Sequence, residues 1–422
     1  MRTRMGLNLN RRGFLGAGTA MAAMLSTGPV GAAAAQAQNS PIKLPPAITR
    51  EERLARLATA RSLMQRHGIG AILVEPGASL DYFTGVQWGR SERLTAAVIP
   101  AQGEPIIVTP FFEKPSVEES LGMSAEVRVW QEDEEPLKLV ADFLKERGVA
   151  AQPLGFEETN RFFILDRLQQ QMPGARIVSA NAVVRASRMI KSTAEIALMK
   201  AATDVTIAAF RELYPQLKAG WTASQVEEEF GNAVRSLGGS NPWGLVLFGP
   251  ASALPHGTGK PQTLARGDVV LLDCGCSVHG YQADVSRTFV FGAPPTAKQR
   301  KVWNQMHRGQ QIAFAAARVG VPAGSVDDAV RRAYESWGYG PRYQLPGLSH
   351  RTGHGIGMEG HEPVNLVHGE TTLLAPGMCF SDEPGIYIPG EFGVRLEDCL
   401  YMTEAGPRWF STPPQSIDRP FA

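Results

Sequence analysis

The chain has 422 residues with a formal net charge of +1, and 43% of its residues are hydrophobic. This length and apolar content suffice for two domains, each with a core of its own. The balanced charge, without a basic stripe, argues against a nucleic-acid-binding surface.

The first 37 residues are typical of a signal peptide for the twin-arginine pathway. Arg11 and Arg12 precede a weakly apolar run rich in glycine and alanine, and Ala35-Gln36-Ala37 offers an A-x-A cleavage site. The run is too short for a stable membrane span, and no other segment approaches that length. We therefore expect a mature chain that begins near Gln38, is exported folded, and works in the periplasm or outside the cell.

An α/β domain is expected over residues 51–188, after a Pro-rich polar leader at 38–50. Helical spacing runs from 51 to 67 and stops at Gly68, where a helix C-terminus is expected. Further helices are expected over 136–147 and 160–171, and strands over 71–74, 96–99, 105–108, 154–156 and 176–178. The acidic run 132–135 predicts a solvated loop.

A second domain is expected over residues 189–422. Ser192 and Glu195 have the spacing of a capping box, in which each side chain satisfies a free backbone N–H of a helix start. The helix that follows should run to about Leu217. A second helix, capped by Thr222, should extend to Leu237, and a third should span 297–319.

Five residues of metal-binding type each lie in a glycine-punctuated, strand-like segment: Asp273, Asp284, His354, Glu383 and Glu397. Four carboxylates and one imidazole suit a pair of hard or borderline divalent cations, because carboxylates bridge two ions and neutralise them. Such a pair would hold a bridging hydroxide and polarise a carbonyl, which indicates hydrolysis of an amide. Manganese, cobalt, zinc and iron all accept this ligand set, so the ligands alone do not choose the metal.

A short internal repeat arranges the carboxylates. The segment LARG, ending at Gly267, leads to Asp273 six residues later, and LAPG, ending at Gly377, leads to Glu383 at the same distance. A second acidic ligand follows each after 11 and 14 positions. We interpret this as a strand–turn–strand unit used twice, with ligands on facing inner surfaces. Chance similarity of two turn-plus-strand segments is the alternative.

Other residues in these segments are candidates for proton transfer and oxyanion stabilisation. Three further histidines qualify: His256, His350 and His361. Glu383 can double as a proton shuttle, and Arg395 shares a strand face with Glu397 and can orient it. For each histidine the alternative is a hydrogen-bonded loop residue.

The four cysteines lie beside the proposed ligands, at positions 274, 276, 379 and 399. Strand alternation points Cys274 and Cys276 away from the face of Asp273, whereas Cys399 shares the face of Glu397. Buried small side chains are the favoured interpretation. A disulfide and a ligand or redox role are the alternatives.

The segments LPHGTGK, LLDCGCSVHGYQADVSRTFVFG, HRTGHGIGMEGHEP and DEPGIYIPGEFGVRLEDC resemble the pita-bread metallopeptidases, which include methionine aminopeptidase, prolidase and aminopeptidase P. The resemblance covers most of residues 68–403. It implies an α+β pita-bread catalytic domain, a homodimer, and two divalent ions on the five ligands, with manganese the expected metal. It also implies that His256 and His361 steady the substrate and its tetrahedral intermediate.

The motif SLDYFTG at 79–85 is similar to the N-terminal domain of the prolidase and creatinase branch, which implies a creatinase-like domain over 51–188. Methionine aminopeptidases lack such a domain. The segments around His361 and Glu397 look most like those of Xaa-Pro peptidases. This implies a small peptide substrate, cleaved before proline by an aminopeptidase or dipeptidase.

Departures from the family pattern put the substrate in doubt more than the metals. Gly360 replaces a bulky apolar residue, Cys274 and Cys276 are atypical, and NPWGLVLFGP before His256 has no assignment. Creatinase lacks the complete ligand set and fits less well. The alternatives are a small-amide hydrolase or a dimethylsulfoniopropionate lyase on the same fold, and a non-catalytic binding protein. In a lyase, aromatic residues would supply cation–π contacts: Trp243, Phe248 or Tyr281.

Overall fold

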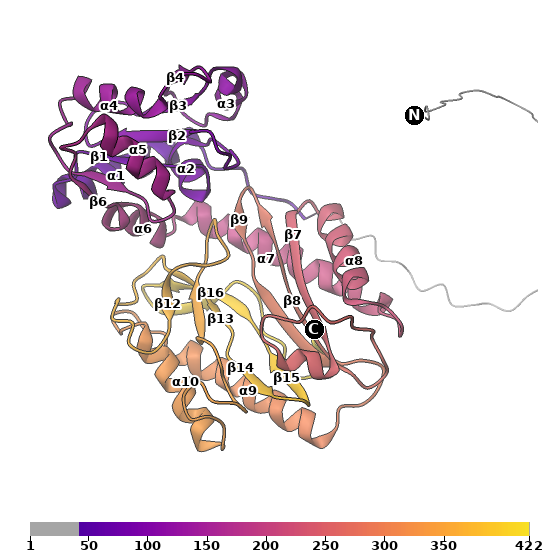
Figure 1. The fold of residues 1–422 in the computed structure, drawn as a ribbon. Coiled ribbons are helices and arrows are strands. Elements are labelled where there is room, and N and C mark those ends of the chain that lie inside the picture. The colour runs from indigo at the N-terminus through magenta and orange to yellow at the C-terminus, as the bar shows by residue number, and fades with distance from the viewer. Residues whose placement is uncertain (1–41, 422) are drawn as a thin grey trace, which may run out of the picture. The chain divides into compact units, whose positions relative to one another are not determined.

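The structure is a computed structural model that describes residues 42–421. The predicted signal peptide and residues 38–41 of the leader lie outside the described residues. The coloured ribbon of Figure 1 begins with helices and strands in alternation, and helices and antiparallel strands follow from α7 onward.

The first sheet, within residues 42–190, has the strand order β4-β3-β2-β1-β5-β6, with β1 antiparallel to β2 and parallel to β5. Its strands are β1 Ala71–Val74, β2 Ala96–Pro100, β3 Ile106–Pro110, β4 Glu126–Trp130, β5 Leu154–Phe156 and β6 Ile177–Ser179. The helices of this part are α1 Arg50–His67, α2 Ala78–Thr84, α3 Lys114–Ser120, α4 Pro136–Glu146, α5 Phe162–Gln171 and α6 Asn181–Met189, with the short η1 Phe111–Glu113.

Strand β1 shows why this sheet is apolar throughout. Ile72 and Val74 pack into one core with α1, α2 and α6, whereas Ala71 and Leu73 pack into another with α4 and α5. Because successive side chains point to opposite faces and helices cover both, all four residues are buried. The predicted α/β alternation is confirmed, although α2, α3, β4 and α6 were not predicted.

Two further sheets and a hairpin make up the rest. The first has the order β10-β8-β7, with β9 on β8, and the second the order β12-β11-β13-β16-β17, while β14 and β15 pair only with each other. The strands are β7 Ser240–Phe248, β8 Val269–Val278, β9 Tyr281–Gln282, β10 Val285–Val290, β11 Gly353–Gly355, β12 Glu362–Leu366, β13 Cys379–Asp382, β14 Gly385–Ile388, β15 Phe392–Arg395, β16 Asp398–Thr403 and β17 Gly406–Trp409.

Helices cover these two sheets on separate cores. They are α7 Thr193–Leu213, α8 Ala223–Ser236, α9 Ala297–Ala316 and α10 Gly324–Ser336, with short η2 Tyr214–Gln216 and η3 Gly249–Ala253. Apolar side chains of α7 and α8 pack on β8, and those of α9 and α10 pack on β13 and β16. The expected α+β arrangement of the second domain is confirmed.

Side-chain caps hold the starts of three predicted helices. Thr49 accepts from the N–H of Glu52 at the start of α1, and both α7 and α8 begin with capping boxes, on Ser192 and Thr222. The predicted ends overshoot: α7 stops at Leu213 rather than Leu217. Pro215 follows in η2 and lacks the N–H that a continuing α-helix needs. Helix α9 ends at 316 rather than 319.

The two halves of the internal repeat have different structures. Strand β8 pairs directly with β10, so Asp273 lies opposite Ser286. In the second copy β13 pairs with β16, and the hairpin of β14 and β15 is inserted between them. A backbone bridge between Ser286 and Glu397 joins the two copies. The carboxylates therefore meet across this junction.

The four cysteines are buried and free, as the favoured interpretation predicted. The thiol of Cys399 donates to the backbone carbonyl of Asp284, with sulfur and oxygen 3.3 Å apart. Burial raises the pKa of Cys399 and of Cys274 well above that of an ordinary thiol. These side chains are therefore packed as neutral thiols.

Among the described residues, no helix is both long and apolar enough to cross a membrane. The acidic run 132–135 lies at the surface before α4, where Glu135 caps the helix by accepting from the N–H of Leu137.

A buried ion pair beneath the junction gives a test of the packing. Arg287 pairs with Asp398 at 2.8 Å, with side-chain exposures of 1% and 0%. We predict that Arg287→Met lowers the free energy of unfolding by about 3–5 kcal/mol, because Asp398 is left charged in the core. Urea unfolding of the metal-free protein measures this loss.

The matched control is Arg300→Met, which removes an Arg–Asp pair whose side chains are 43% and 49% exposed. Its cost should stay below about 1 kcal/mol, because water replaces the lost contact. Equal losses in the two variants would contradict the assignment.

Candidate metal centre

The five predicted ligands line one cavity of about 610 Å³. The other predicted site residues line it too: His256, His350, His361 and Arg395. The remaining wall residues are Trp243, Leu245 and Arg351, of which Leu245 and Arg351 were not singled out from the sequence. Segments more than a hundred residues apart thus meet in one place.

Strand pairing explains how the ligands converge. Asp273 lies within β8 and His354 at the centre of β11, whereas three ligands lie at strand ends: Asp284 before β10, Glu383 after β13 and Glu397 before β16. Carboxylates at strand ends project past the last ladder hydrogen bonds into the space between the sheets.

The ligand atoms form overlapping groups around His354. Its Nε2 lies 3.2 Å from Glu383 Oε1, 3.8 Å from Asp284 Oδ2 and 3.9 Å from Glu397 Oε1. Its Nδ1 lies 3.0 Å from the carbonyl oxygen of Gly355, a contact that assigns the proton to Nδ1 and leaves the Nε2 lone pair for a metal. Three groups of donors suited to a metal lie here, each with its atoms within 4.8 Å of one another.

The carboxylates fit bound cations for an electrostatic reason. Asp284 Oδ1 and Glu397 Oε1 are buried without a hydrogen-bond partner. Burial, followed by repulsion from Asp273 and Glu383, raises the pKa of Asp284 well above that of an ordinary aspartate. Burial and the charges of Asp284 and Glu383 do the same for Glu397. Divalent cations would bind the unpaired oxygens and also neutralise the repulsion among the carboxylates.

Arg395 supports the centre through Asp273 and not through a direct pair with Glu397. Its guanidinium ion-pairs with Asp273, and its Nε donates to Ser286 Oγ at 3.0 Å. Ser286 Oγ lies 2.9 Å from both Asp273 Oδ1 and Glu397 Oε2. Arg395 thus reaches Glu397, which it was predicted to orient, through this hydroxyl rather than through a direct hydrogen bond. Ser286 had no signal in the sequence beyond its place after Asp284.

His350 is held by hydrogen bonds at both ring nitrogens. Its Nδ1 lies 2.7 Å from the carbonyl oxygen of Arg351, and its Nε2 lies 2.8 Å from Tyr387 Oη. Tyr387 accepts from Arg395 Nη1 at 3.0 Å, so its own proton points to His350. Burial lowers the pKa of His350 to about 4, so the ring is neutral. This geometry gives His350 a positioning role and no free nitrogen for proton transfer.

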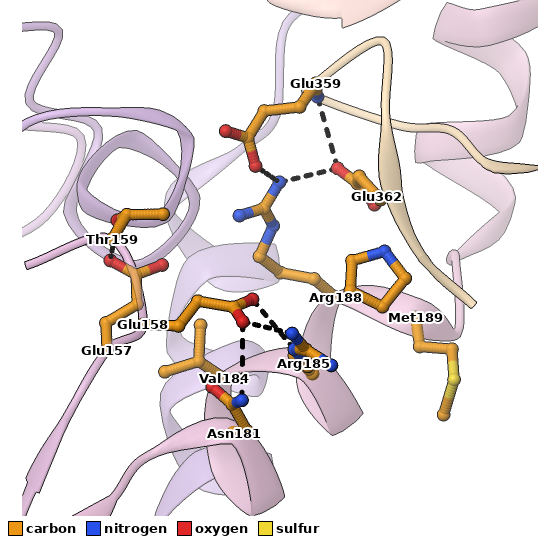
Figure 2. Close-up of a pocket in the computed structure, with 11 residues that line it drawn as sticks. Glu157, Glu158, Thr159, Asn181, Val184, Arg185, Arg188, Met189, Glu359 and Glu362 are labelled. Atoms are coloured by element: carbon orange, nitrogen blue, oxygen red, sulfur yellow. Dashed lines mark hydrogen bonds and ion pairs between the residues drawn. The ribbon is translucent and has the colours of Figure 1, made fainter. Parts of the chain in front are cut away.

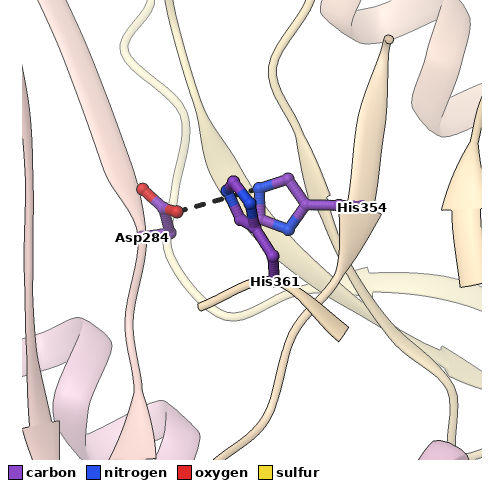
Figure 3. A group of neighbouring side chains, drawn as sticks. All are labelled: Asp284, His354 and His361. Atoms are coloured by element: carbon purple, nitrogen blue, oxygen red, sulfur yellow. Dashed lines mark ion pairs between the residues drawn. The ribbon is translucent and has the colours of Figure 1, made fainter. Parts of the chain in front are cut away.

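His256 and His361 are exposed at the cavity. The His361 ring lies 4.1 Å from that of His354, and its nitrogen falls in one of the metal-type groups together with Asp284 (Figure 3). Burial, then the charges of His354 and Arg351, lower the pKa of His361 to about 4. A neutral His361 keeps one N–H to donate. Arg395 Nη1 donates to the carbonyl of Pro255 at 3.1 Å, which positions the loop of His256.

The segment before His361 is held from the side of α6 and α7. Glu362 forms an ion pair with Arg188 at 2.6 Å (Figure 2). It also pairs with Lys191 at 3.0 Å and accepts from the N–H of Met358 at 2.9 Å. Although burial opposes ionisation, these two cations lower the pKa of Glu362 to about 2. Glu362 therefore holds the loop that carries His361. Only its position beside His361 could have singled it out in the sequence.

Comparisons with known proteins agree with this geometry. Residues 197–404 match "Metallopeptidase family M24" and residues 56–190 match "Creatinase/Prolidase N-terminal domain". The chain is 33% identical to "Probable dipeptidase PepE" of Mycobacterium tuberculosis, over 83% of this chain and 92% of that protein. It is 29% identical to "Xaa-Pro dipeptidase" of Lactobacillus delbrueckii subsp. lactis, over 81% and 93%.

A solved structure is similar along nearly its whole length. The dipeptidase PepE of Mycobacterium ulcerans has a TM-score of 0.80 and 32% identity, covering 88% of this chain and 98% of that one. The fold and the ligand-lined cavity define a metal-dependent hydrolase with a creatinase-type N-terminal domain. The chain belongs to metallopeptidase family M24, with the pita-bread fold, and is a metallopeptidase of the kind that works with divalent metal ions.

The repulsion among the carboxylates predicts opposite effects of one variant with and without metal. In the metal-free protein, Asp284→Asn should raise the free energy of unfolding by about 1–3 kcal/mol, because it removes one of the buried carboxylates that repel one another. With divalent metal at a hundred times its Kd, the wild type should gain about 2.7 kcal/mol and the variant far less.

Thermal unfolding with a chelator and with added Mn²⁺ measures both effects. Asp133→Asn, an exposed position, is the control and should follow the wild type under both conditions. A variant that keeps the full metal-dependent stabilisation would remove Asp284 from the ligand set.

Proposed function

We propose that this protein cleaves the peptide bond before proline in small peptides, with two divalent cations on Asp273, Asp284, His354, Glu383 and Glu397. The observation that carries the proposal is the convergence of all five donors in one cavity, beside two exposed histidines. Manganese is the proposed metal, and a homodimer is the proposed assembly. Cations bound there supply Lewis acidity towards a carbonyl and lower the pKa of water.

The side chains around the ligands divide the remaining work. His361, neutral at working pH, donates an N–H towards the oxygen of the scissile carbonyl as negative charge develops on it. His256 faces the same cavity, on the loop that Arg395 positions, and is proposed to donate a hydrogen bond to the same oxygen. Glu383 is partly exposed in the cavity, and we assign to it the transfer of a proton from water to the leaving nitrogen.

Two findings favour a peptidase over the lyase alternative. The two relatives and the solved structure described above are named dipeptidases, and one is named an Xaa-Pro dipeptidase. Of the aromatic residues considered for a sulfonium site, Tyr281 is buried and donates its hydroxyl to Glu195 at 2.8 Å, away from the cavity. Phe248 is also buried, and Trp243 alone of the three lines the cavity.

The direct test is hydrolysis by the mature protein loaded with Mn²⁺, Co²⁺, Zn²⁺ or Fe²⁺. Ala-Pro should release proline, whereas Ala-Ala should be cleaved poorly and dimethylsulfoniopropionate should give no dimethyl sulfide. Glu383→Gln should lower kcat by about 10²-fold or more, because a carboxylate is lost from proton transfer.

The matched control is Glu404→Gln, at an exposed glutamate in the turn between β16 and β17, which should leave kcat unchanged. The proposal is wrong if no Xaa-Pro peptide is cleaved with any of the four metals. Release of dimethyl sulfide would favour the lyase alternative instead.

We also propose export by the twin-arginine pathway, supported by the pattern of residues 11–37. Changing Arg11 and Arg12 together to lysine should retain the uncleaved chain in the cytoplasm, because the pathway reads the arginine pair. Fractionation of cells and the mass of the mature N-terminus measure this, with Arg2→Lys and Arg4→Lys as the control. Unchanged export of the Arg11/Arg12 variant would refute the assignment.

A further inference from the structure

Arg351 is a cation in the metal cavity whose guanidinium has no described partner. Two arginines line the cavity, and Arg395 is fully engaged by Asp273, Ser286 and Tyr387. Within residues 42–421 no hydrogen bond or ion pair involves the Arg351 side chain, and only its carbonyl is bonded, to His350. An arginine that is partly buried in a cavity with five free N–H groups is suited to an anionic ligand.

The backbone of Arg351 is held in place by the network behind it. Arg395 donates to Tyr387, Tyr387 donates to His350, and His350 donates to the carbonyl of Arg351. The next residue, Thr352, donates its N–H and its hydroxyl to Asp327 Oδ1 at 3.1 and 2.7 Å. The guanidinium therefore projects from a fixed backbone next to the ligand His354, three positions along the chain.

The charges in the cavity leave Arg351 unbalanced once cations are bound. Asp273 pairs with Arg395 and is also a proposed cation ligand. With Asp284, Glu383 and Glu397 it balances the charge of two divalent cations, which leaves no carboxylate of the cavity for Arg351. Arg351 and His361 line the same cavity. A ligand with a negative group placed beyond the scissile bond would complete this balance.

The rest of the wall is apolar and suits a proline ring. Trp243 and Leu245 lie on β7 and face the cavity. Gly275 of β8 allows this position of the indole, because a Cβ there would lie 2.7 Å from Trp243 Nε1. Together with Arg351, these residues offer one apolar surface and one cation on the part of the wall that is not taken by ligands or histidines.

We infer that Arg351 binds the C-terminal carboxylate of an Xaa-Pro dipeptide and so makes the enzyme select dipeptides over longer chains. The inference rests on the proposed function and adds a residue that determines specificity. A planar guanidinium forms two parallel hydrogen bonds with a carboxylate. In a longer peptide an uncharged amide replaces that carboxylate, and the chain continues where the guanidinium lies.

Kinetics on three substrates test the inference. Wild-type enzyme should prefer Ala-Pro to Ala-Pro amide and to Ala-Pro-Ala, mainly through KM. Arg351→Gln should raise KM for Ala-Pro by about 10- to 100-fold, the size expected for losing hydrogen bonds to a charged group. It should leave KM for the amide nearly unchanged, and Arg351→Lys should restore part of the preference because it keeps the charge.

The matched control is Arg408→Gln, an exposed arginine of β17 outside this cavity, which should behave as wild type. Equal changes in KM for the dipeptide and its amide would overturn the role of Arg351. Loss of cleavage of every Xaa-Pro substrate by the wild type would instead refute the proposed function.

Binding separates the two hypotheses without turnover. Calorimetric titration of the metal-loaded protein should show tighter binding of L-proline than of L-prolinamide, and Arg351→Gln should remove this difference. The same preference in wild type and variant, or no measurable binding of L-proline to the wild type, would overturn the inference.

Discussion

The mutual repulsion of buried carboxylates is the constraint around which the second half of this protein is built. Asp284 and Glu397 each keep a buried oxygen without a hydrogen-bond partner, and burial together with neighbouring charges raises the pKa of both. Such a cluster destabilises the fold by itself. The bridge from Ser286 to Glu397 and the pair of Arg395 with Asp273 hold the two sheets together there. The fold thus keeps these mutually repelling carboxylates, whose repulsion bound cations relieve.

The ligands could be predicted from the sequence because each lies in a local pattern, a strand followed by glycine or a turn. The residues that support them could not. Tyr387 contacts His350 only because the hairpin of β14 and β15 folds back over the segment before β11, and neither spacing nor residue type reveals that contact. Helix α10 was missed for a related reason: its buried Asp327 and Arg331 pair with each other and interrupt the apolar stripe.

His350 illustrates how position in a motif can mislead about chemistry. A histidine four residues before a ligand and among glycines is easily interpreted as a proton carrier. In the structure one ring nitrogen is hydrogen-bonded to a backbone carbonyl and the other to a tyrosine hydroxyl. The ring therefore links Arg395, through Tyr387, to the backbone of Arg351 and holds that backbone in place. A residue in this role affects what the cavity binds more than how a proton moves.

The N-terminal domain supplies no ligand, yet its contacts reach segments on either side of the ligands. Arg56 of α1 donates to Tyr281 at 2.8 Å, three residues before Asp284, and Arg188 of α6 pairs with Glu362, the neighbour of His361. Both contacts are buried, so removing either partner leaves an unsatisfied charge or hydroxyl. Between these two contacts, the N–H of Gln282 donates to the carbonyl of Gly357 at 2.8 Å. The strand that leads to Asp284 and the loop that carries His361 are therefore held to each other and to the same domain. This coupling gives a physical reason for a creatinase-type domain in an enzyme whose metal ligands all lie beyond residue 270.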